Sequence, residues 1–368
     1  MTVSLAKMRY FIFAGGGTGG HIYPNLAVSD ALSRQCRDAQ IIFFCSSRDI
    51  DARILAPSGY DFLPLPAIGF SLRKCLLFFA QFVKSYYFVK QILTPIRREA
   101  VVIGTGGFVT APVVLAAKTL KIPIYLINVD SVPGKANRFL ARFANKVFVQ
   151  FAETAACFKA SHAEVLGCPL RSGFQNPDRH KPFSDLALEE NKKILLITGA
   201  SSGSASINNT MISILPELNA FAAVWQVVHL TGLLHIEKVK EAVKGLDIAY
   251  HAVDYYDDMP NLLAAADVVV GRAGAVSVAE YAAAGVSAVC LPYPYHKDRH
   301  QYKNAHVLAD AGAAVIVDDN ISNPSQTAHD LLTVLKDLLA DDAKRGQMAA
   351  AARKIGITDA AERILAAL

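Results

Sequence analysis

Residues 9–24 read RYFIFAGGGTGGHIYP, an apolar run followed by a glycine-rich turn. An unbroken apolar run of this length is typical of a strand in a parallel sheet, because helices cover both faces of such a sheet. A glycine-rich turn between a strand and a helix presents backbone N–H groups at the positive end of the helix, where they attract phosphate. Residues 193–204, KILLITGASSGS, repeat this order of strand, small-residue turn and helical segment. The repeat predicts an α/β chain with two Rossmann-like, doubly wound domains.

The same alternation of strand and helix runs through the whole chain. Short apolar segments, many rich in β-branched residues, are separated by helical segments, which predicts βαβ units and parallel sheets. The predicted strands are Arg9–Ala14, Gln40–Cys45, Val101–Gly104, Ile124–Leu126, Lys146–Val149, Lys193–Thr198, Val224–Leu230, Ile248–His251, Asp267–Gly271, Ala288–Leu291 and Ala314–Val317.

The domain boundaries follow from length and local composition. A chain of 368 residues suits two domains at roughly 100–200 residues each. The segment between the two repeats is polar, contains Pro177 and Pro182 and has little periodicity, as linkers do. We therefore expect an amino-terminal domain at 1–172, a linker at 173–192 and a carboxy-terminal domain at 193–349. The alanine-rich helix at 350–368 is expected to complete the first domain.

The composition limits the class of protein. Hydrophobic residues make up 52% of the chain and charged residues 19%, which is enough apolar material for two cores and argues against disorder. The net charge of +5 suits an anionic substrate or membrane surface and gives no strong signal for nucleic acid. None of the six cysteines forms a C-x-x-C pair, so we expect buried thiols in a reducing compartment. With no targeting segment or long apolar span recognised, we expect a cytoplasmic, soluble or peripheral protein.

Other nucleotide-binding classes fit the first turn less well. Gly15, Gly17 and Gly20 match G-x-G-x-x-G, but a lone match is weak. A dinucleotide-binding domain needs an acidic residue at the end of its second strand, where this chain has Ser-Ser-Arg at 46–48. No Walker lysine follows any turn. Each glycine turn could simply permit a tight connection, but a third turn at 104–107 favours diphosphate ligands.

Several motifs together resemble those of one family. They are TGGHIYP at 18–24, GTGGF at 104–108, GCPLR at 167–171, GASSG at 199–203, YDDM at 256–259, RAGAVSVAE at 272–280 and the highly specific HKDRHQYKNA at 296–305. Over nearly its whole length the chain resembles the MurG family, which transfers N-acetylglucosamine from UDP to lipid I and so makes lipid II for peptidoglycan. The resemblance implies the GT-B fold, in which two Rossmann-like domains flank a cleft, and a role in cell-wall synthesis, cell shape and division.

The resemblance implies that the carboxy-terminal domain binds the donor, UDP-N-acetylglucosamine. The implied donor residues are Arg171, Ser201, Tyr256, Ala275, Val276, Ser277, Glu280 and Gln301. Ser201 and its turn are expected at the diphosphate, with Arg171 as a positive charge. Glu280 is expected to accept hydrogen bonds from the ribose diol, since an ionised carboxylate only accepts. Tyr256 is expected at the uracil and Gln301 at the sugar.

The amino-terminal domain is implied to bind the undecaprenyl-diphosphate-linked acceptor. The implied residues are Thr18, Gly19, Gly20, Gly106, Gly107 and Asp130. Two departures fall on this side. Many members have His-Glu-Gln-Asn where this chain has Ile-Asn-Val-Asp at 127–130, and Phe108 stands where the family has tyrosine. A third departure is Ser202, in place of glutamine. Because the first two departures fall on the acceptor side, a different acceptor is an open alternative.

Transfer from an α-linked donor to a β-linked product inverts the anomeric carbon, and one in-line displacement suffices. His21 is the candidate base, because it ends a glycine-rich turn and histidine titrates near neutral pH. The alternative, that His21 only binds phosphate, is about equally weighted. We expect no metal and no cofactor, since no Asp-x-Asp pair ends a strand and the histidines at 296 and 300 lack the spacing of a zinc site.

Residues 71–98 are a candidate membrane surface. The segment has basic residues and many aromatics but no Asp or Glu. A helix of this kind can insert aromatics among lipid headgroups while its lysines meet anionic lipid. A packed helix with a solvated basic edge is the alternative. The expected location is the cytoplasmic face of the cell membrane.

Three functions remain open at this point. The first is N-acetylglucosamine transfer to lipid I. The second is a related GT-B transferase with another lipid or natural-product acceptor. The third is a non-catalytic protein that binds nucleotide or lipid diphosphate, against which the motifs around His21, Glu280 and Gln301 argue.

Overall fold

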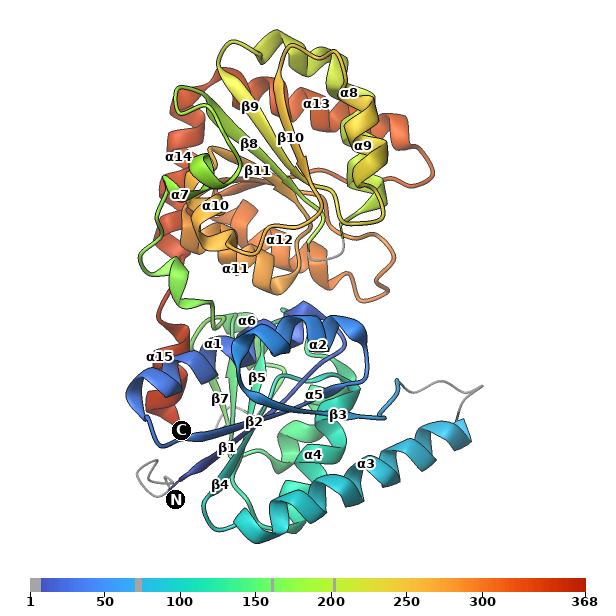
Figure 1. The fold of residues 1–368 in the computed structure, drawn as a ribbon, viewed down its shortest axis with the longest axis vertical. Coiled ribbons are helices and arrows are strands. Elements are labelled where there is room, and N and C mark those ends of the chain that lie inside the picture. Colours follow the sequence, from blue (N-terminus) through green and yellow to red (C-terminus); the bar gives the residue numbers. More distant parts are fainter. Residues whose placement is uncertain (1–7, 70–74, 160–161, 201–202) are drawn as a thin grey trace. The chain divides into compact units, whose positions relative to one another are not determined.

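The computed structural model describes residues 8–69, 75–159, 162–200 and 203–368 (Figure 1). It forms two α/β units, one made of Met1–Ser172 and Thr358–Leu368 and the other of Gly173–Ile357. Each unit has a parallel sheet and a core of its own. The predicted fold class, two doubly wound α/β domains, is therefore confirmed.

The first unit is built on a parallel sheet. The strand order is β3 (Asp61–Leu65), β2 (Gln40–Ser46), β1 (Tyr10–Ala14), β4 (Ala100–Gly104), β5 (Ile124–Asn128), β6 (Lys146–Val149) and β7 (Ala163–Val165). Its helices are α1 (Gly19–Gln35), α2 (Asp49–Leu55), α3 (Cys75–Ile96), α4 (Gly107–Thr119), α5 (Lys135–Leu140), α6 (Ala152–Ala155) and α15 (Ala360–Ala367). The sequence patterns did not predict β3 or β7, the two edge strands.

Helices cover both faces of this sheet, as its apolar strands require. On β1, Ile12 and Ala14 belong to a buried cluster that includes residues of α3 and α4. Phe11 and Phe13 are also buried, and alternation along a strand directs them to the opposite face. α15 packs beside α1 (Figure 1). Burial on both faces of the sheet thus explains why β1 is apolar throughout.

The second unit repeats the plan. Its strand order is β10 (Ala249–Val253), β9 (Trp225–Leu230), β8 (Lys193–Thr198), β11 (Val268–Gly271), β12 (Ser287–Cys290) and β13 (Ala314–Ile316). Its helices are α7 (Lys181–Asp185), α8 (Ala205–Leu218), α9 (Ile236–Ala242), α10 (Met259–Ala265), α11 (Ala275–Ala284), α12 (His300–Asp310), α13 (Pro324–Ala340) and α14 (Asp342–Ile355). Residues of β8, β11, α8 and α13 share one buried cluster.

Two segments outside the repeats have definite places. Residues 173–192, expected as a linker, are grouped with the second unit. There the backbone N–H of Glu189 donates to Gln226 over 2.9 Å, and that of Asp178 donates to Asn261 over 2.6 Å. The carboxy-terminal run is divided between two helices. α14 belongs to the second unit and α15 to the first.

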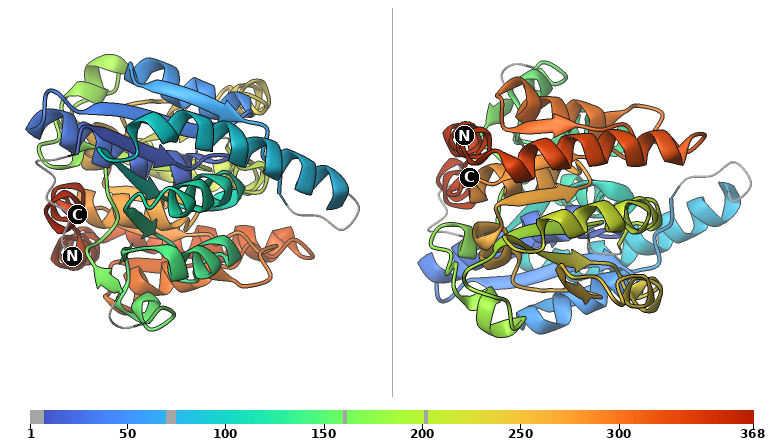
Figure 2. Two further views of the ribbon diagram at one scale, coloured as in Figure 1. Left: turned by 90° about the horizontal axis from the view of Figure 1, so that it is seen from below. Right: turned by 90° about the horizontal axis from the view of Figure 1, so that it is seen from above.

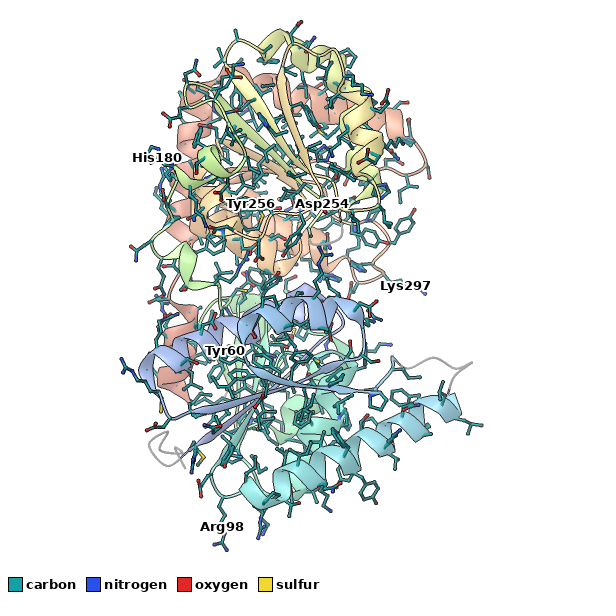
Figure 3. The ribbon with its side chains drawn as sticks, in the orientation of Figure 1. Tyr60, Arg98, His180, Asp254, Tyr256 and Lys297 are labelled. Carbon is teal, nitrogen blue, oxygen red and sulfur yellow. The ribbon has the colours of Figure 1, made fainter. Side chains whose placement is uncertain are left out.

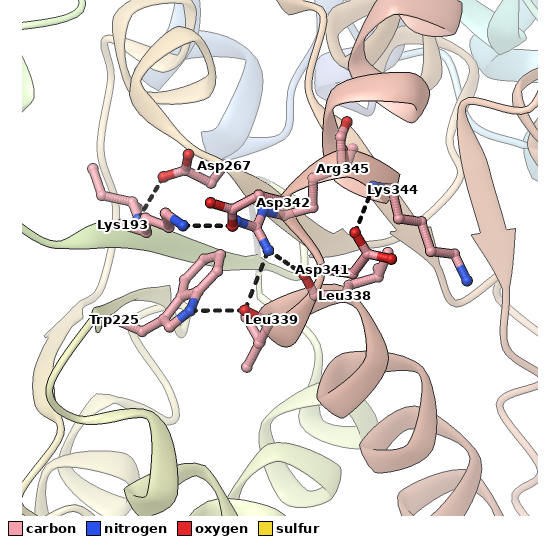
Figure 4. Close-up of polar contacts among 11 residues, drawn as sticks. Lys193, Trp225, Asp267, Leu338, Leu339, Asp341, Asp342, Lys344 and Arg345 are labelled. Carbon is pink, nitrogen blue, oxygen red and sulfur yellow. Dashed lines mark hydrogen bonds and ion pairs between the residues drawn. The ribbon is translucent and has the colours of Figure 1, made fainter.

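The chain's single tryptophan marks the packing of the second unit (Figure 4). The indole N–H of Trp225, on β9, donates to the carbonyl of Leu339 over 3.2 Å. The guanidinium of Arg345 lies 4.8 Å from the centroid of the Trp225 ring and donates to the same carbonyl over 3.2 Å. Because Trp225 is fully buried against the α13–α14 junction, its fluorescence reports unfolding of this unit.

α3 has two apolar faces. Ser85, Val89 and Leu93 are buried on the face that meets the sheet. Leu76, Phe79, Val83 and Tyr87 follow helical spacing on another face and are exposed, Leu76 to 88%. The helix runs out past the edge of its own sheet (Figures 1 and 2). Part of the predicted membrane segment, residues 71–74, lies outside the described residues. None of the helices within the described ranges has the length and apolar character that a membrane span requires.

Candidate active site

Topology indicates where each unit binds its ligand. In the first unit the strand order reverses between β1 and β4, and in the second it reverses between β8 and β11. Open α/β sheets bind ligands beyond the carboxyl ends of the strands at such a point. The glycine turns at 15–18 and 105–106 follow β1 and β4. The turns at 199–204 and 272–274 follow β8 and β11. The glycine turns of both units thus follow the strands that flank the reversal points.

The first glycine turn is held in shape by the residues after β2. The N–H of Gly17 lies 2.9 Å from both carboxylate oxygens of Asp51, which is fully buried. Arg48 donates to the carbonyl of Gly17 over 2.9 Å. Gly17 has a φ of +87°, a conformation that favours glycine. Thr18 then caps α1 from an extended conformation, with no hydrogen bond from its side chain to the cap. The first N–H groups of α1, at Gly19 and Gly20, therefore follow a rigid turn.

The second glycine turn lies against His21. A Cβ added to Gly107 would come within 3.4 Å of both the carbonyl of Gly16 and Nδ1 of His21. The hydroxyl of Thr105 donates to the backbone carbonyl of His21 over 2.6 Å. The structure thus brings the two predicted turns of the first unit together around this histidine. Glycine is favoured at position 107 by its φ of +80°.

A chain of asparagines joins the second turn to Asp130. Asn137 is packed beside Gly106, where a Cβ would come within 2.7 Å of its Oδ1. The side chain of Asn137 donates to Asn128 over 3.0 Å, and Asn128 donates to the backbone carbonyl of Asp130 over 2.7 Å. Asp130 is therefore placed at the same sheet edge as the glycine turns, as expected of a residue that follows β5.

Arg171 belongs to the first unit, although the sequence assigned it to the donor. Its guanidinium lies 4.9 Å from the centroid of the Tyr23 ring on α1. Both residues are part of motifs that the sequence singled out. A cation is thus placed beside the first turn of α1, where anionic ligands are favoured.

In the second unit, the turn after β8 has two residues with positive φ. They are Ala200 at +64° and Gly203 at +73°. The N–H of Gly203 donates to the carbonyl of Ala200 over 3.0 Å. Ser204 caps α8 by accepting from the N–H of Ile207. Ser201, the predicted diphosphate residue of this turn, lies outside the described residues.

A buried ion pair ties this turn to three strands. Arg272, just after β11, pairs with Asp319 over 2.7 Å, and both side chains are less than a tenth exposed. Arg272 also donates to the hydroxyl of Ser204 over 2.8 Å and to the carbonyl of Leu291 over 2.9 Å. The α8 cap, the end of β12 and the segment after β13 are therefore fixed relative to one another.

α11 and α12 present the remaining donor candidates. Ala275 begins α11 and is buried, whereas Val276, Ser277 and Glu280 are partly exposed and lie within one turn of the same face. The side chain of Gln301, near the start of α12, accepts from the backbone N–H of Tyr293 over 2.9 Å. Two hydrogen bonds hold these helices in place: buried Asn304 donates to the carbonyl of Ala273, and Arg272 donates to Leu291.

Tyr256 differs from the other donor candidates. Its hydroxyl donates to Asp185 over 2.8 Å, and the residue is labelled in Figure 3. Burial, and then the bond to Asp185, raise the pKa of Tyr256. The hydroxyl of Tyr256 is thus bonded within the second unit, so a contact to a nucleobase would come from its ring or its backbone.

The polar loop before α12 is not built as a metal site. Within the described ranges, no group of three or more His, Cys, Asp or Glu side chains is arranged to hold a metal ion. The rings of His296 and His300 stack at 4.1 Å, and His300 pairs with Asp298 over 2.7 Å. Although burial opposes it, the bond to His300 lowers the pKa of Asp298. The loop delivers Gln301 to the sheet edge.

Known proteins match this chain over nearly its whole length. Models of the glycosyltransferase family 28 N-terminal and C-terminal domains match residues 11–149 and 194–364. A UDP-N-acetylglucosamine–N-acetylmuramyl-(pentapeptide) pyrophosphoryl-undecaprenol N-acetylglucosamine transferase of Lactiplantibacillus plantarum is 36% identical, over 97% of this chain and 98% of the relative. A relative of the same name from Desulfitobacterium hafniense is 36% identical over 96% of this chain and 97% of its own.

A crystal structure of Acinetobacter baumannii MurG has a TM-score of 0.74 to this chain at 26% identity, covering 97% of each. The chain belongs to the MurG family. A UDP-GlcNAc 2-epimerase of Neisseria meningitidis, at 13% identity and a TM-score of 0.68, shares the fold alone.

Two of the three departures from the MurG pattern, at Phe108 and at residues 127–130, lie within the described residues, whereas Ser202 lies outside them. A Cβ on Gly17 would come within 3.3 Å of the Phe108 ring, and Arg48 lies 5.5 Å from the centroid of that ring. Asn128 and Asp130 belong to the network around Asn137. Both departures therefore border the glycine turns of the first unit.

Several residues of this site were missed by the sequence analysis. They are Arg48, Asp51, Asn137, Asp319 and the ion-pairing role of Arg272. Asp51 and its partner Gly17 are 34 positions apart, and Arg272 and Asp319 are 47 apart. The one available signal was a run of polar residues directly after β2, at the sheet edge where ligands bind.

Proposed function

We infer that this chain transfers N-acetylglucosamine from UDP-N-acetylglucosamine to N-acetylmuramyl-(pentapeptide) pyrophosphoryl-undecaprenol, a step in peptidoglycan precursor synthesis. The carrying observation is that relatives bearing this activity in their names align with the chain from end to end. Each unit also has a phosphate-type turn at its topological reversal point, which suits a reaction between two diphosphate-bearing substrates.

We propose that the second unit binds the donor. The N-termini of α8 and α11, with Ser201 and residues 275–277, would meet the diphosphate. Glu280, on the same face of α11 as Ser277, would accept hydrogen bonds from the ribose hydroxyls. The side-chain oxygen of Gln301 accepts from Tyr293, and its amide N–H groups would donate to the sugar. The ring of Tyr256 is proposed at the uracil.

We propose that the first unit binds the acceptor. Its diphosphate would meet the N–H groups at Thr18, Gly19 and Gly20, with Gly106 and Gly107 opposite. Arg171, placed over Tyr23 beside α1, would supply positive charge on this side. Asp130 would lie at the edge of the same site through its link to Asn128.

The proposed chemistry is a single inverting displacement with His21 as base. Nδ1 of His21 lies 3.3 Å from the carbonyl of Gly16 and 3.4 Å from the hydroxyl of Thr18. In the proposed tautomer Nδ1 carries the hydrogen and donates to the carbonyl, which can only accept. Nε2 is then the unprotonated nitrogen that can take the proton of the acceptor hydroxyl. Helix N-termini stabilise the departing diphosphate of UDP. No metal or cofactor is part of this proposal.

The direct test follows labelled N-acetylglucosamine from UDP onto a short-chain analogue of the acceptor. We expect transfer with UDP as the second product. Binding of UDP-N-acetylglucosamine without transfer to this analogue, but with transfer to another lipid-linked or natural-product acceptor, would identify a related transferase. Binding without transfer to any acceptor would identify a non-catalytic binding protein. Either result would contradict the proposed function.

We propose that α3 attaches the enzyme peripherally to the cytoplasmic face of the cell membrane. The exposed stripe at Leu76, Phe79, Val83 and Tyr87 carries an exposed lysine, Lys84, beside it. Apolar side chains and lysines together bind anionic interfaces. A lipid-linked acceptor is reached at such a surface.

Substitution of this stripe should release the protein from vesicles. We expect Phe79→Glu to lower binding to anionic phospholipid vesicles by about 10-fold or more, since burying an aromatic side chain contributes about 1.5–3 kcal/mol. Co-sedimentation measures the binding. Transfer to a water-soluble acceptor should stay at the wild-type rate. Leu234→Glu is the matched control, because Leu234 is 88% exposed but belongs to the second unit. Equal binding by Phe79→Glu and wild type contradicts the proposal.

A further inference from the structure

One peptide group links the catalytic candidate His21 to a buried carboxylate. The peptide between Gly16 and Gly17 directs its carbonyl to Nδ1 of His21, at 3.3 Å. Its N–H points the other way, to Asp51, at 2.9 Å from each carboxylate oxygen. In a trans peptide the C=O and N–H are antiparallel, so a single planar group spans the gap between the two side chains.

Asp51 is held firmly on its side of the peptide. It is fully buried on α2, and its Oδ2 accepts from both the N–H and the hydroxyl of Ser46 over 2.7 Å. Gly16 packs so closely on it that an added Cβ would come within 2.3 Å of Oδ2. All of the hydrogen-bond partners given for the carboxylate are donors, so it acts as an acceptor toward both Gly17 and Ser46. The peptide plane is therefore fixed by a group outside the glycine turn.

We propose that Asp51 is a positioning residue for His21 and acts through the Gly16–Gly17 peptide. This inference rests on the proposed function, in which His21 is the base. Holding the Gly16 carbonyl toward Nδ1 fixes the tautomer and the ring orientation, and Nε2 faces the acceptor. A carboxylate that accepts from the amide N–H also polarises the amide, which strengthens acceptance by its carbonyl when the ring becomes positively charged.

Transfer of N-acetylglucosamine needs no reactant besides the donor and the acceptor. The acceptor oxygen forms a bond to the anomeric carbon as the bond from that carbon to the donor phosphate oxygen breaks. The electron pair leaves with UDP, and the proton of the acceptor hydroxyl moves to Nε2 of His21. Asp51 exchanges no proton in this step, so its proposed effect is on the geometry and polarity of the peptide alone.

The amide isostere tests this arrangement. In Asp51→Asn, an N–H₂ group replaces one carboxylate oxygen and faces either Gly17 or Ser46, both of which donate. Two donors cannot bond to each other, so the side chain loses a hydrogen bond to Gly17 or to Ser46 in either orientation of the amide. We expect kcat for transfer to a soluble acceptor analogue to fall by about 10- to 100-fold, the scale of a lost charged hydrogen bond and of a misplaced catalytic group. The dissociation constant of UDP-N-acetylglucosamine should not change.

A double-mutant cycle separates positioning from a general structural role. If Asp51 acts through His21, then adding Asp51→Asn to His21→Ala should lower kcat by no more than about threefold further. Tyr60→Phe is the matched control for lost stability: Tyr60 (Figure 3) is in the same unit and its hydroxyl donates to Asp30 over 2.8 Å, remote in sequence from both turns. It should lower the melting temperature with wild-type kcat.

Two results would overturn the inference while leaving the function intact. One is wild-type kcat in folded Asp51→Asn. The other is a loss that multiplies fully with that of His21→Ala, because Asp51 would then act on another group. Wild-type turnover by His21→Ala would show that His21 is not the base, and it would contradict the positioning role of Asp51 as well. Absence of transfer by the wild-type protein would instead contradict the proposed function.

Discussion

We expect His21→Ala to lower kcat for N-acetylglucosamine transfer by about 10²- to 10⁴-fold, the range found for a positioned general base. Binding of UDP-N-acetylglucosamine should be unchanged, since His21 is in the first unit and the donor candidates at 275–301 are in the second. Single-turnover assays with a short-chain acceptor, together with titration of the donor, measure the two quantities separately.

The expectation rests on how His21 is fixed. Its backbone carbonyl is tied to Thr105, and its ring lies beside Gly107. Nδ1 is directed to Gly16, which leaves Nε2 for the substrate. A histidine that only bound phosphate would make the same contact to Gly16 and donate from Nε2 to the phosphate, so the kinetics of His21→Ala separate the two roles.

The control is another histidine of the same unit. His162 is exposed, and the hydrogen bonds given for it are made by its backbone. His162→Ala should transfer at the wild-type rate. If His21→Ala also transfers at that rate, the enzyme assignment stands and His21 is not the base. A rise in the acceptor KM with an unchanged kcat would point to phosphate binding instead.

The parts of the site that could be predicted from sequence are local in the chain. The turn at 15–20 and the turn at 199–204 each combine a strand, small residues and a helix start within a dozen positions. Such a pattern fixes both the fold class and the place of the phosphate sites, because parallel sheets bring the carboxyl ends of their strands to one edge. The edge strand β3 was not predicted because this short segment contains Asp61 and Pro64, residue types that are depleted in strands.

The parts that could not be predicted depend on contacts between distant residues. Asp51 is one acidic residue among others near the start of α2, and only the folded chain shows that it is buried beneath Gly17. Tyr256 was expected at the uracil, and no sequence pattern indicated that its hydroxyl donates to Asp185, 71 positions away. Residues 173–192 were expected as a linker from their polarity, and their polar groups bond to Gln226 and Asn261.

The second large effect is expected at the buried ion pair of the second unit. We expect Arg272→Ala to lower the free energy of unfolding of this unit by about 3–5 kcal/mol, because it leaves the carboxylate of Asp319 buried without its partner. Urea titration followed by the fluorescence of Trp225 measures the loss, since that tryptophan is buried in the same unit. Lys240→Ala is the control. Lys240 forms an exposed pair with Glu237, and such pairs contribute at most about 1 kcal/mol.

Replacing both charges separates stability from ligand binding. In the double variant Arg272→Met, Asp319→Leu no buried charge is left unpaired, so much of the lost stability should return. Donor binding by the double variant should be weaker than donor binding by the wild type. The reason is that Ser204 at the α8 cap and the carbonyl of Leu291 lose the guanidinium that joins them. Isothermal titration with UDP-N-acetylglucosamine decides the point. Restored stability with wild-type affinity would mean that Arg272 only balances Asp319. Restored stability with weak binding would mean that the guanidinium holds the donor turn in its binding conformation.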